Sequence, residues 1–517
     1  MHGVLAGVVA AACALATGEL IAGLVASVPS PVAAVGAAVI DLAPPGAKQV
    51  AVGLFGTADK PAILLLVTLA VLLAGAAIGL WHRRSAEDAR IAIGALVAVG
   101  ALASLRITSA SLVAVAAAAI VQIAMGIGAL SWLGARGRAA SAEAASAGRR
   151  RFLVGAGALG VSAVAAGGIG RWLVDGRASR VAGTGTGSPS ASGKPGTAPG
   201  SMPSAIEPAG TPPPDASFAI DGITPIVMPN NDFYRIDTAL VTPSVDIASW
   251  SLRVHGMVDR EVNLTFSELV QLPLIERYVT IACVSNEVGG HLVGNAKWTG
   301  VRLLDVLEMA GVKQGATQVV PRSVDGWTAG FPTAWLHDAA NPRDALIAVK
   351  MNDAPLPVEH GYPARLIVPG LYGYVSATKW LSELELTTLG AFDAYWVPRG
   401  WAKEAPILTQ SRIDVPRDSS SLAAGKQAIA GVAWAPDRGV NAVEIAVDGG
   451  PWQPAILATA LNKATWVQWK FAWDATPGQH IIEVRATDGT GEVQTADRTP
   501  PDPDGARGHD RIAVSVS

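Results

Sequence analysis

One cysteine at the end of an apolar, β-branched run is the residue of this chain best suited to chemistry. The run is YVTIACV, and Cys283 is followed by a stretch of small and polar residues, VSNEVGG. The chain has only one other cysteine, Cys13, which lies in a separate apolar run near the N-terminus. Two cysteines placed in this way make no disulfide framework. Cys283 is therefore expected to be a free thiol or thiolate.

A cysteine in such a position has three common uses: nucleophile, redox thiol or metal ligand. A nucleophile needs an adjacent base, and His291 is close in sequence, but no Cys-His-Asn signature surrounds it. A redox thiol normally has a resolving cysteine, and none is near. A zinc site made by protein alone needs several ligands at short spacing, and only His291 is close. Two possibilities remain for Cys283. It is either a thiolate that gives one bond to a metal held mainly by another group, or a buried structural cysteine.

The segments on both sides of Cys283 alternate between strand and helix patterns. Strand-like pieces such as WSLRVHGMV, YVTIACV and ALIAVKM are interrupted by the helical pieces SELVQL and VRLLDVLEMAG. Thr265 is expected to cap the first helical piece, and Gly311 is expected to end the second. This mixture predicts an α+β domain, which we place at residues 216–390.

The C-terminal part reads as all-β. Short strand-like pieces, among them AIAGVAWA, AVEIAVDGG, WVQWKFAW and HIIEVRATDG, are separated by turn signals. Asp448-Gly449 and Asp488-Gly489 are dipeptides typical of tight turns. We predict an immunoglobulin-like sandwich over residues 391–517.

The first third of the chain is dominated by Ala, Val, Leu, Gly and Ile. Its long apolar segments are residues 4–28, 61–80, 91–105, 107–133 and 152–173. A helix that spans a membrane needs about 20 predominantly apolar residues. The segment 91–105 is short and ends at Arg106, whose side chain can extend to the interface. We predict an all-α transmembrane region over residues 1–173 with five transmembrane helices, in contact with membrane lipid.

Basic residues predict the orientation of this region. Arg83, Arg84 and Arg90 lie between the second and third apolar segments, and Arg136 and the run at 149–151 lie between the fourth and fifth. The positive-inside rule places both loops in the cytoplasm. Five crossings then give a multi-pass cell-membrane protein with a cytoplasmic N-terminus and an extracytoplasmic catalytic domain.

The fifth apolar segment opens with GRRRFLVGAGALG, which resembles a twin-arginine export motif. Export of this kind moves folded proteins and is typical of enzymes that receive their cofactor in the cytoplasm. An ordinary positive-inside flank would also supply arginines. Residues 174–215 are rich in Gly, Ser, Thr and Pro and predict a disordered linker. The formal net charge of −3 gives no indication of nucleic-acid binding.

Three sequence blocks occur in an order that identifies a family. They are TIACVSNEVGG, GNAKWTGVRLLDVLEMAGV and MNDAPLPVEHGYPARLIVPGLYGYVSATKWLSELEL. They resemble the sulfite oxidase family of molybdopterin enzymes, and DGGPWQPA and WVQWKFAW resemble the dimerisation-type domain of that family. The resemblance implies that Cys283 binds molybdenum beside the two dithiolene sulfurs of a single pterin cofactor. A soft thiolate suits such a metal.

The resemblance also assigns residues that contact the cofactor or the substrate. The cofactor residues, besides Cys283, are Asn231, Phe233, Tyr234, Ser285, His360, Arg365, Ser376, Thr378 and Lys379. His360 and Arg365 match residues that hold the cofactor phosphate and pterin, a task that suits a guanidinium group. Arg235 sits where sulfite oxidases place an active-site arginine, which would bind an anionic substrate.

Two departures from the family pattern bear on the substrate. Sulfite oxidases have a second arginine shortly after the ligand cysteine, where this chain has Glu-Val-Gly at 287–289. They also have an active-site tyrosine at the place nearest Trp327. A less charged or larger substrate is therefore expected, such as a sulfoxide or an amine oxide. A sulfite dehydrogenase and a non-catalytic membrane binding protein are the alternatives. His291 is a candidate for proton transfer.

No built-in electron relay is expected. The chain has no CxxCH haem attachment motif and no four-cysteine cluster. The predicted cofactor is molybdenum with one molybdopterin, without haem or an iron–sulfur cluster. Electrons would then pass to or from a separate partner, either a quinol or membrane protein or a soluble redox protein. The dimerisation-type domain is compatible with a homodimer, although a membrane anchor could replace that function.

Overall fold

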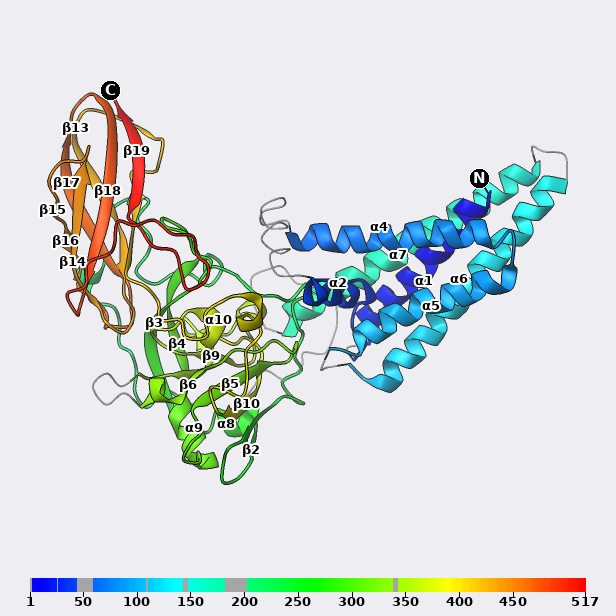
Figure 1. The fold of residues 1–517 in the computed structure, drawn as a ribbon, viewed down its shortest axis with the longest axis horizontal. Coiled ribbons are helices and arrows are strands. Elements are labelled where there is room, and N and C mark those ends of the chain that lie inside the picture. Colours follow the sequence, from blue (N-terminus) through cyan, green and yellow to red (C-terminus); the bar gives the residue numbers. More distant parts are fainter. Residues whose placement is uncertain are drawn as a thin grey trace. The chain divides into compact units, whose positions relative to one another are not determined.

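The computed structural model describes residues 2–25, 27–43, 59–107, 110–142, 147–181, 202–337 and 343–517. The chain forms two compact units, which are described separately (Figure 1). The first contains residues 1–181 and a short returning segment, 238–244, and the second contains the rest of the chain. Residues 182–201, the centre of the predicted linker, lie outside the described ranges.

The first unit is helical, as predicted. Its helices are α1 His2–Leu24, α2 Pro31–Leu42, α4 Asp59–Trp81, α5 Ala86–Ser104, α6 Leu112–Ala142 and α7 Ala147–Val181. Within the described ranges, 4 helical stretches are long and apolar enough to cross a membrane: His2–Leu24, Lys60–Trp81, Leu112–Arg136 and Gly148–Val174. Helix α7 continues to Val181, so the predicted linker begins later than residue 174.

The third of the five predicted spans is not among these stretches. Helix α5 covers residues 91–104 of it, and Glu87, Asp88 and Arg90 in the first turns precede the apolar run, which is short, as expected. Helix α2 was not predicted as a separate element. It starts at Pro31, and Ser30 caps it by accepting a hydrogen bond of 3.2 Å from the backbone nitrogen of Ala33. A capping serine followed by proline is a strong helix start.

Glycine allows the first two long helices to approach each other closely. A Cβ atom on Gly3 of α1 would lie 2.7 Å from the carbonyl oxygen of Gly79 in α4, and one on Gly7 would overlap Gly75. Small residues let helix backbones come close together, and this contact maximises van der Waals packing. The glycines therefore explain how α1 and α4 pack.

The second unit begins with the mixed α and β domain. Its strands are β1 Ser251–Gly256, β2 Val262–Thr265, β3 Leu274–Ala282, β4 Val293–Arg302, β5 Gln318–Ser323, β6 Phe331–Pro332, β7 Leu346–Met351, β8 Ala354–Pro355, β9 Arg365–Ile367 and β10 Leu381–Thr387. Its helices are α8 Phe266–Leu269, α9 Leu303–Ala310 and α10 Gly373–Ser376, with short 3-10 turns at Pro214–Ala216, Thr333–Leu336 and Val358–His360. The predicted start and stop signals are confirmed, since Thr265 forms a capping box with Glu268 and Gly311 adopts φ +68°.

Two sheets organise this domain. One has the order β2-β1-β10-β5-β6, and the other has the order β3-β4-β7-β8 with β9 paired to β7. Strands β3 and β4 form a regular antiparallel ladder from Leu274 opposite Val301 to Ala282 opposite Val293. Both strands are almost wholly buried, in keeping with their β-branched and aromatic residues. The ladder places the residue after Ala282 at the end of a rigid strand.

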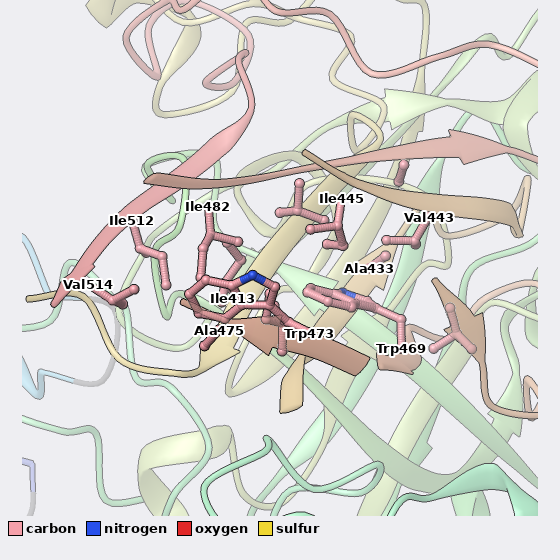
Figure 2. Close-up of a cluster of buried hydrophobic side chains, with 14 of the residues drawn as sticks. Ile413, Ala433, Val443, Ile445, Trp469, Trp473, Ala475, Ile482, Ile512 and Val514 are labelled. Carbon is pink, nitrogen blue, oxygen red and sulfur yellow. The ribbon is translucent and has the colours of Figure 1, made fainter. Parts of the chain in front are cut away.

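The C-terminal part is all-β, as predicted. A 3-10 turn at Val397–Arg399 precedes its strands, which are β11 Gln410–Val415, β12 Ser421–Leu422, β13 Gly425–Trp434, β14 Val440–Val447, β15 Gln453–Pro454, β16 Ile456–Leu457, β17 Val467–Ala475, β18 Gly478–Asp488 and β19 Asp510–Val516. They form two sheets, β11-β13-β17-β16 and β12-β19-β18-β14-β15. Both sheets contribute to one core, to which Trp469 of β17, Ile445 of β14 and Ile482 of β18 belong (Figure 2). The immunoglobulin-like assignment stays a prediction.

Candidate active site

Cys283 stands where β3 ends, and a short closed loop follows it. Its backbone nitrogen donates to the carbonyl oxygen of Leu292 at 2.9 Å, and its own carbonyl accepts from the nitrogen of Asn286 at 3.0 Å. The side-chain oxygen of Asn286 accepts from the nitrogen of Leu292 at 2.7 Å. Cys283 is 9% exposed and forms no disulfide bond. The sulfur is thus presented by a strand end and a hydrogen-bonded loop.

Two phenols lie near this thiol, the half-buried Tyr234 and the buried Tyr372. Burial raises the pKa of Tyr234 and of Tyr372, and the neighbouring Cys283 adds to both shifts. Tyr372 precedes helix α10, whose Gly373 would bring a Cβ atom to 3.6 Å from the carbonyl oxygen of Ala282. Both phenols therefore stay protonated at neutral pH, as hydroxyl groups beside the sulfur.

A buried arginine and a buried histidine form the next part of the site. Nη1 of Arg365 donates to the carbonyl oxygen of His360 at 3.0 Å, and its guanidinium carbon lies 5.0 Å from the ring centre of Trp298. Burial lowers the pKa of Arg365 to about 10. Nε2 of His360 lies 3.0 Å from the carbonyl oxygen of Asn230. Burial, with Lys379 nearby, lowers the pKa of His360 to about 3, so His360 is neutral.

Phe233 joins these groups into one aromatic wall. Its ring stacks on Tyr234 with centroids 5.2 Å apart, and it meets the rings of Trp298 and His360 edge to face at 5.8 Å and 5.6 Å. The predicted residues Phe233, Tyr234 and His360 are thus brought together. Trp298 was missed, although it lies in the quoted block GNAKWTG.

Three buried polar atoms in this region have no hydrogen-bond partner within the described part of the chain. They are Nδ1 of His360, Nε of Arg365 and Oγ1 of Thr378. Leaving such atoms unpaired costs free energy, so a bound group that supplies partners is expected. All three residues belong to the set assigned to the phosphate and pterin of the cofactor. The donor set therefore fits a molybdopterin.

Other predicted cofactor residues are placed differently. The hydroxyl of Ser376 donates to the carbonyl oxygen of Tyr372 at 3.0 Å, inside its own helical turn. Asn231 and Ser285 are exposed. It is Asn230, one position earlier than Asn231, whose carbonyl oxygen meets His360. A register of one residue in an irregular loop is beyond what a sequence pattern can specify.

A charged cluster centres on Asp237, which was not predicted. One oxygen of its carboxylate, Oδ2, accepts from Nζ of Lys379 at 3.1 Å and from Nε of Arg235 at 3.2 Å. Lys379 also donates to the carbonyl oxygen of Glu359 at 2.8 Å. The side chain of Asp237 is 5% exposed, whereas that of Arg235 is 45% exposed. Burial lowers the pKa of Lys379 to about 8.

Trp327 lies beside a second acidic residue. Its backbone nitrogen donates to Oδ1 of Asp325 at 3.1 Å. Burial raises the pKa of Asp325, and the neighbouring Asp237 adds to the shift. The indole nitrogen of Trp327 is buried and has no protein partner among the described residues. Trp327 and Asp325 therefore belong to the region around Asp237.

His291 is exposed, at the far end of the loop that follows Cys283. Partial desolvation lowers its pKa, and its charged neighbours are Arg412, Asp414 and Asp510. It is thus associated with the C-terminal strands. Among the described residues, no group of three or more His, Cys, Asp or Glu side chains is arranged to hold a metal ion.

Comparison with known proteins identifies the domain that carries this site. Residues 239–396 match the family model for an oxidoreductase molybdopterin binding domain. The uncharacterized oxidoreductase YuiH of Bacillus subtilis (strain 168) is 37% identical over 156 residues, which cover 30% of this chain and 74% of that protein. The chain belongs to the sulfite oxidase family of molybdopterin oxidoreductases. It is a molybdopterin-dependent oxidoreductase.

More distant relatives share larger parts of the chain. Human mitochondrial sulfite oxidase is 28% identical over 304 residues, which cover 50% of this chain and 55% of that protein. The chain thus spans about half the length of the mammalian sulfite oxidases. Among solved structures, the sulfane dehydrogenase SoxCD from Paracoccus pantotrophus is 22% identical, covers 59% of this chain and 86% of that chain, and has a TM-score of 0.48.

Proposed function

We propose that this protein is a membrane-anchored, extracytoplasmic molybdenum enzyme that reduces a small, uncharged oxide, such as a sulfoxide or an amine oxide. The reaction consumes two electrons and two protons and releases the reduced compound and water. The observation that carries the proposal is the single carboxylate of Asp237, which pairs with both Arg235 and Lys379.

The residues around Cys283 supply the binding part of this function. Cys283 would give one thiolate ligand to molybdenum, and His360, Arg365 and Thr378 would hold the phosphate and pterin of a single molybdopterin. When bound, this cofactor supplies two-electron oxygen-atom transfer. The chain orients the thiolate through the closed loop after β3 and surrounds it with the phenols of Tyr234 and Tyr372.

The charges beside Trp327 favour an uncharged substrate. Arg235 is the residue that would attract an anion, but its guanidinium is paired with Asp237. The same carboxylate oxygen also pairs with Lys379, and Asp325 adds a second acidic group. An anion would have to compete with these carboxylates, because like charges that face each other weaken binding. The buried indole nitrogen of Trp327 offers a hydrogen-bond donor to the oxygen of a neutral oxide.

A specific observation also favours sulfite oxidation as a second candidate function. Arg235 is 45% exposed, so its guanidinium is accessible at the place where the family resemblance puts an anion-binding arginine. Curated relatives with sequence similarity over half of the chain are named sulfite oxidases. In this case sulfite would have to displace Asp237 from Arg235.

We propose five membrane spans, with α5 as the third. Its 19 residues reach about 28 Å at 1.5 Å per residue, close to the thickness of a bilayer core. One face of α5 is buried, while Ile91, Val99 and Leu102 are more than half exposed, which suits contact with lipid. Five spans with the basic loops on the cytoplasmic side support an extracytoplasmic catalytic domain. The twin-arginine-like run at 149–151 is compatible with export of the loaded domain.

The proposal includes a separate redox partner and leaves a homodimer as an option through the C-terminal strands. The test uses the full-length protein, purified in detergent, with molybdenum confirmed by elemental analysis. Dimethyl sulfoxide and trimethylamine N-oxide are assayed with a reduced dye, and sulfite is assayed with an oxidised dye. We expect kcat/KM for one of the oxides to exceed that for sulfite by at least about tenfold. The opposite order would establish the sulfite function, and protein without molybdenum would indicate a non-catalytic binding protein.

A further inference from the structure

Strand β3, which carries Cys283, lies at the edge of its sheet, and the C-terminal domain covers that edge. The sheet order β3-β4-β7-β8 leaves one side of β3 without a neighbouring strand. Residues 206 and 207 pair with the first residues of that side, and residues 462–466 cover the part nearer Cys283. Thr280 donates from its backbone nitrogen to the carbonyl oxygen of Ala464 at 2.9 Å, and its hydroxyl accepts from the backbone nitrogen of Trp466 at 2.8 Å. The side chain of Asn462 donates to the carbonyl oxygen of Tyr278 at 3.0 Å.

The C-terminal domain also holds the loop on the other side of Cys283. Nη1 of Arg412, in β11, donates to the carbonyl oxygen of Gly290 at 2.9 Å. The rest of this guanidinium is engaged by Oδ1 of Asp414 at 2.7 Å and by the hydroxyl of Thr224 at 2.7 Å. The side chain of Arg412 is 3% exposed. A buried guanidinium with its donors oriented in this way is rigid and tolerates little movement of its partners.

Asp510, at the start of β19, is a third point of contact. Its carboxylate oxygen Oδ2 accepts from the backbone nitrogen of Ile413 at 2.8 Å. Its other oxygen packs against Gly289, where a Cβ atom would overlap it. Gly289 adopts φ +76°, which favours glycine. The loop can therefore approach the C-terminal strands closely only because glycine stands at this position.

We propose that the C-terminal domain is a positioning element for the thiol, with Arg412 as its principal positioning residue. The strand before Cys283 and the loop after it are both hydrogen-bonded to residues 391–517, so the domain holds both ends of the segment that presents the sulfur. The inference rests on the proposed function in that the positioned thiol is taken as the metal ligand. It assigns the C-terminal domain a role in the active site in addition to any role in association.

The test measures how accessible Cys283 is in full-length protein produced in a host that lacks molybdopterin synthesis. Iodoacetamide labelling is followed at the peptide that contains Cys283, which separates it from Cys13. We expect Arg412→Gln to raise the labelling rate by about tenfold or more, a factor that corresponds to about 1.4 kcal/mol of lost restraint. Arg412→Lys keeps the charge but not the planar fork, and an intermediate rate is expected.

Arg438→Gln is the matched control. Arg438 is a half-buried arginine in the turn between β13 and β14. It donates to Asp488 at 2.7 Å and to the carbonyl oxygen of Ile407 at 3.0 Å, and among the described residues it has no hydrogen bond to the cysteine loop. The labelling rate of Cys283 in Arg438→Gln should equal that in the wild type. Equal rates for Arg412→Gln, Arg438→Gln and wild type would overturn the proposal. If Arg412→Gln does not unfold cooperatively, Arg412→Lys decides in the same way.

The cofactor-loaded protein provides a second readout. Loss of the Arg412 contact should change the electron paramagnetic resonance spectrum of the partly reduced metal, because that spectrum depends on the orientation of the thiolate. If Arg412→Gln changes the labelling of Cys283 but purified wild-type protein contains no molybdenum, the positioning role stands and the proposed function is rejected. If wild-type protein contains molybdenum but substitution of Arg412 changes neither the labelling nor the spectrum, the proposed function stands and the positioning role is rejected.

Discussion

The cofactor side and the substrate side of this site differ in whether their polar groups have partners within the protein. On the cofactor side, buried atoms of His360, Arg365 and Thr378 have no protein partner in the described ranges. On the substrate side, Arg235 and Lys379 are both paired with one oxygen of Asp237. The first arrangement leaves buried polar atoms for a ligand to pair, whereas in the second both cations already share a carboxylate partner. The unpaired buried polar atoms of this site therefore lie where the cofactor would bind, whereas the charged groups near Arg235 are already paired with one another.

The largest expected effect comes from the residue that both sides share. Cys283→Ala should reduce activity below detection, because the metal would lose its protein ligand and the site its orientation. X-ray absorption should show one sulfur fewer at the metal. Cys13→Ala, a substitution of the buried thiol in helix α1, is the matched control and should leave both measurements unchanged. Full activity of Cys283→Ala would contradict the metal-ligand assignment.

On the cofactor side, Arg365→Lys should empty the site. A lysine has no planar guanidinium. It therefore cannot donate to the carbonyl oxygen of His360 and also offer the second donor, Nε, to the cofactor. We expect the molybdenum content to fall about tenfold or more, in the range typical for lost supporting contacts of a metal site. Elemental analysis and the fluorescence of released pterin measure it. Arg253→Lys, in an exposed pair with Glu261, should retain full content; equal loss in both variants would indicate general destabilisation.

On the substrate side, Asp237→Asn should shift selectivity toward anions. The change removes the carboxylate shared by Arg235 and Lys379, and the 45% exposed guanidinium of Arg235 loses this anionic neighbour. We expect the ratio of kcat/KM for sulfite to that for the oxide to rise about tenfold. Asp393→Asn, which removes an exposed partner of Lys403, serves as the control. An unchanged ratio would show that Asp237 does not set substrate charge.

The smallest effect concerns the pH dependence of stability in cofactor-free protein. The pKa of His360 is lowered to about 3 by burial, while a histidine in an unfolded chain titrates near 6.5. Between these values the unfolded state binds a proton that the folded state excludes, so the free energy of unfolding falls as the pH drops from about 6.5 toward 3. His360→Gln should flatten this slope between about pH 5 and 6.5.

Urea titrations at several pH values measure that slope. His337→Gln, at an exposed histidine of the same domain, should keep the wild-type slope. If His360→Gln and the wild type have equal slopes, another group controls acid stability, and the contrast between the two sides of the site would lose its electrostatic support.

Local signals predicted the elements that present the chemistry. The β-branched run before Cys283 became β3, Thr265 capped a helix, and Gly311 ended one. These features depend on backbone preferences and on neighbours within a few residues. The family blocks also placed His360 and Arg365 together, since they lie on one short turn and the strand after it.

Other features were beyond reach for identifiable reasons. Asp237 meets Lys379 across 142 positions, and no pattern states which carboxylate will neutralise which cation. Asn230 rather than Asn231 faces His360, because an irregular loop has no periodicity that sets its register. In the first unit, the sequence pattern predicted no separate helix at Pro31–Leu42, because the helix depends on the cap at Ser30 and has only 12 residues.

The amino-acid sequence by itself determined which groups are present: one thiol at a strand end, a basic cofactor set, an apolar first third and an all-β C-terminal part. Only the tertiary structure decided how these groups compensate one another. It paired Lys379 with Asp237, and it joined Gly290 to Arg412 of the C-terminal strands. The physical reason is that local conformation follows from short-range sterics and hydrogen bonds, whereas charge pairing and desolvation depend on which distant segments share a buried volume.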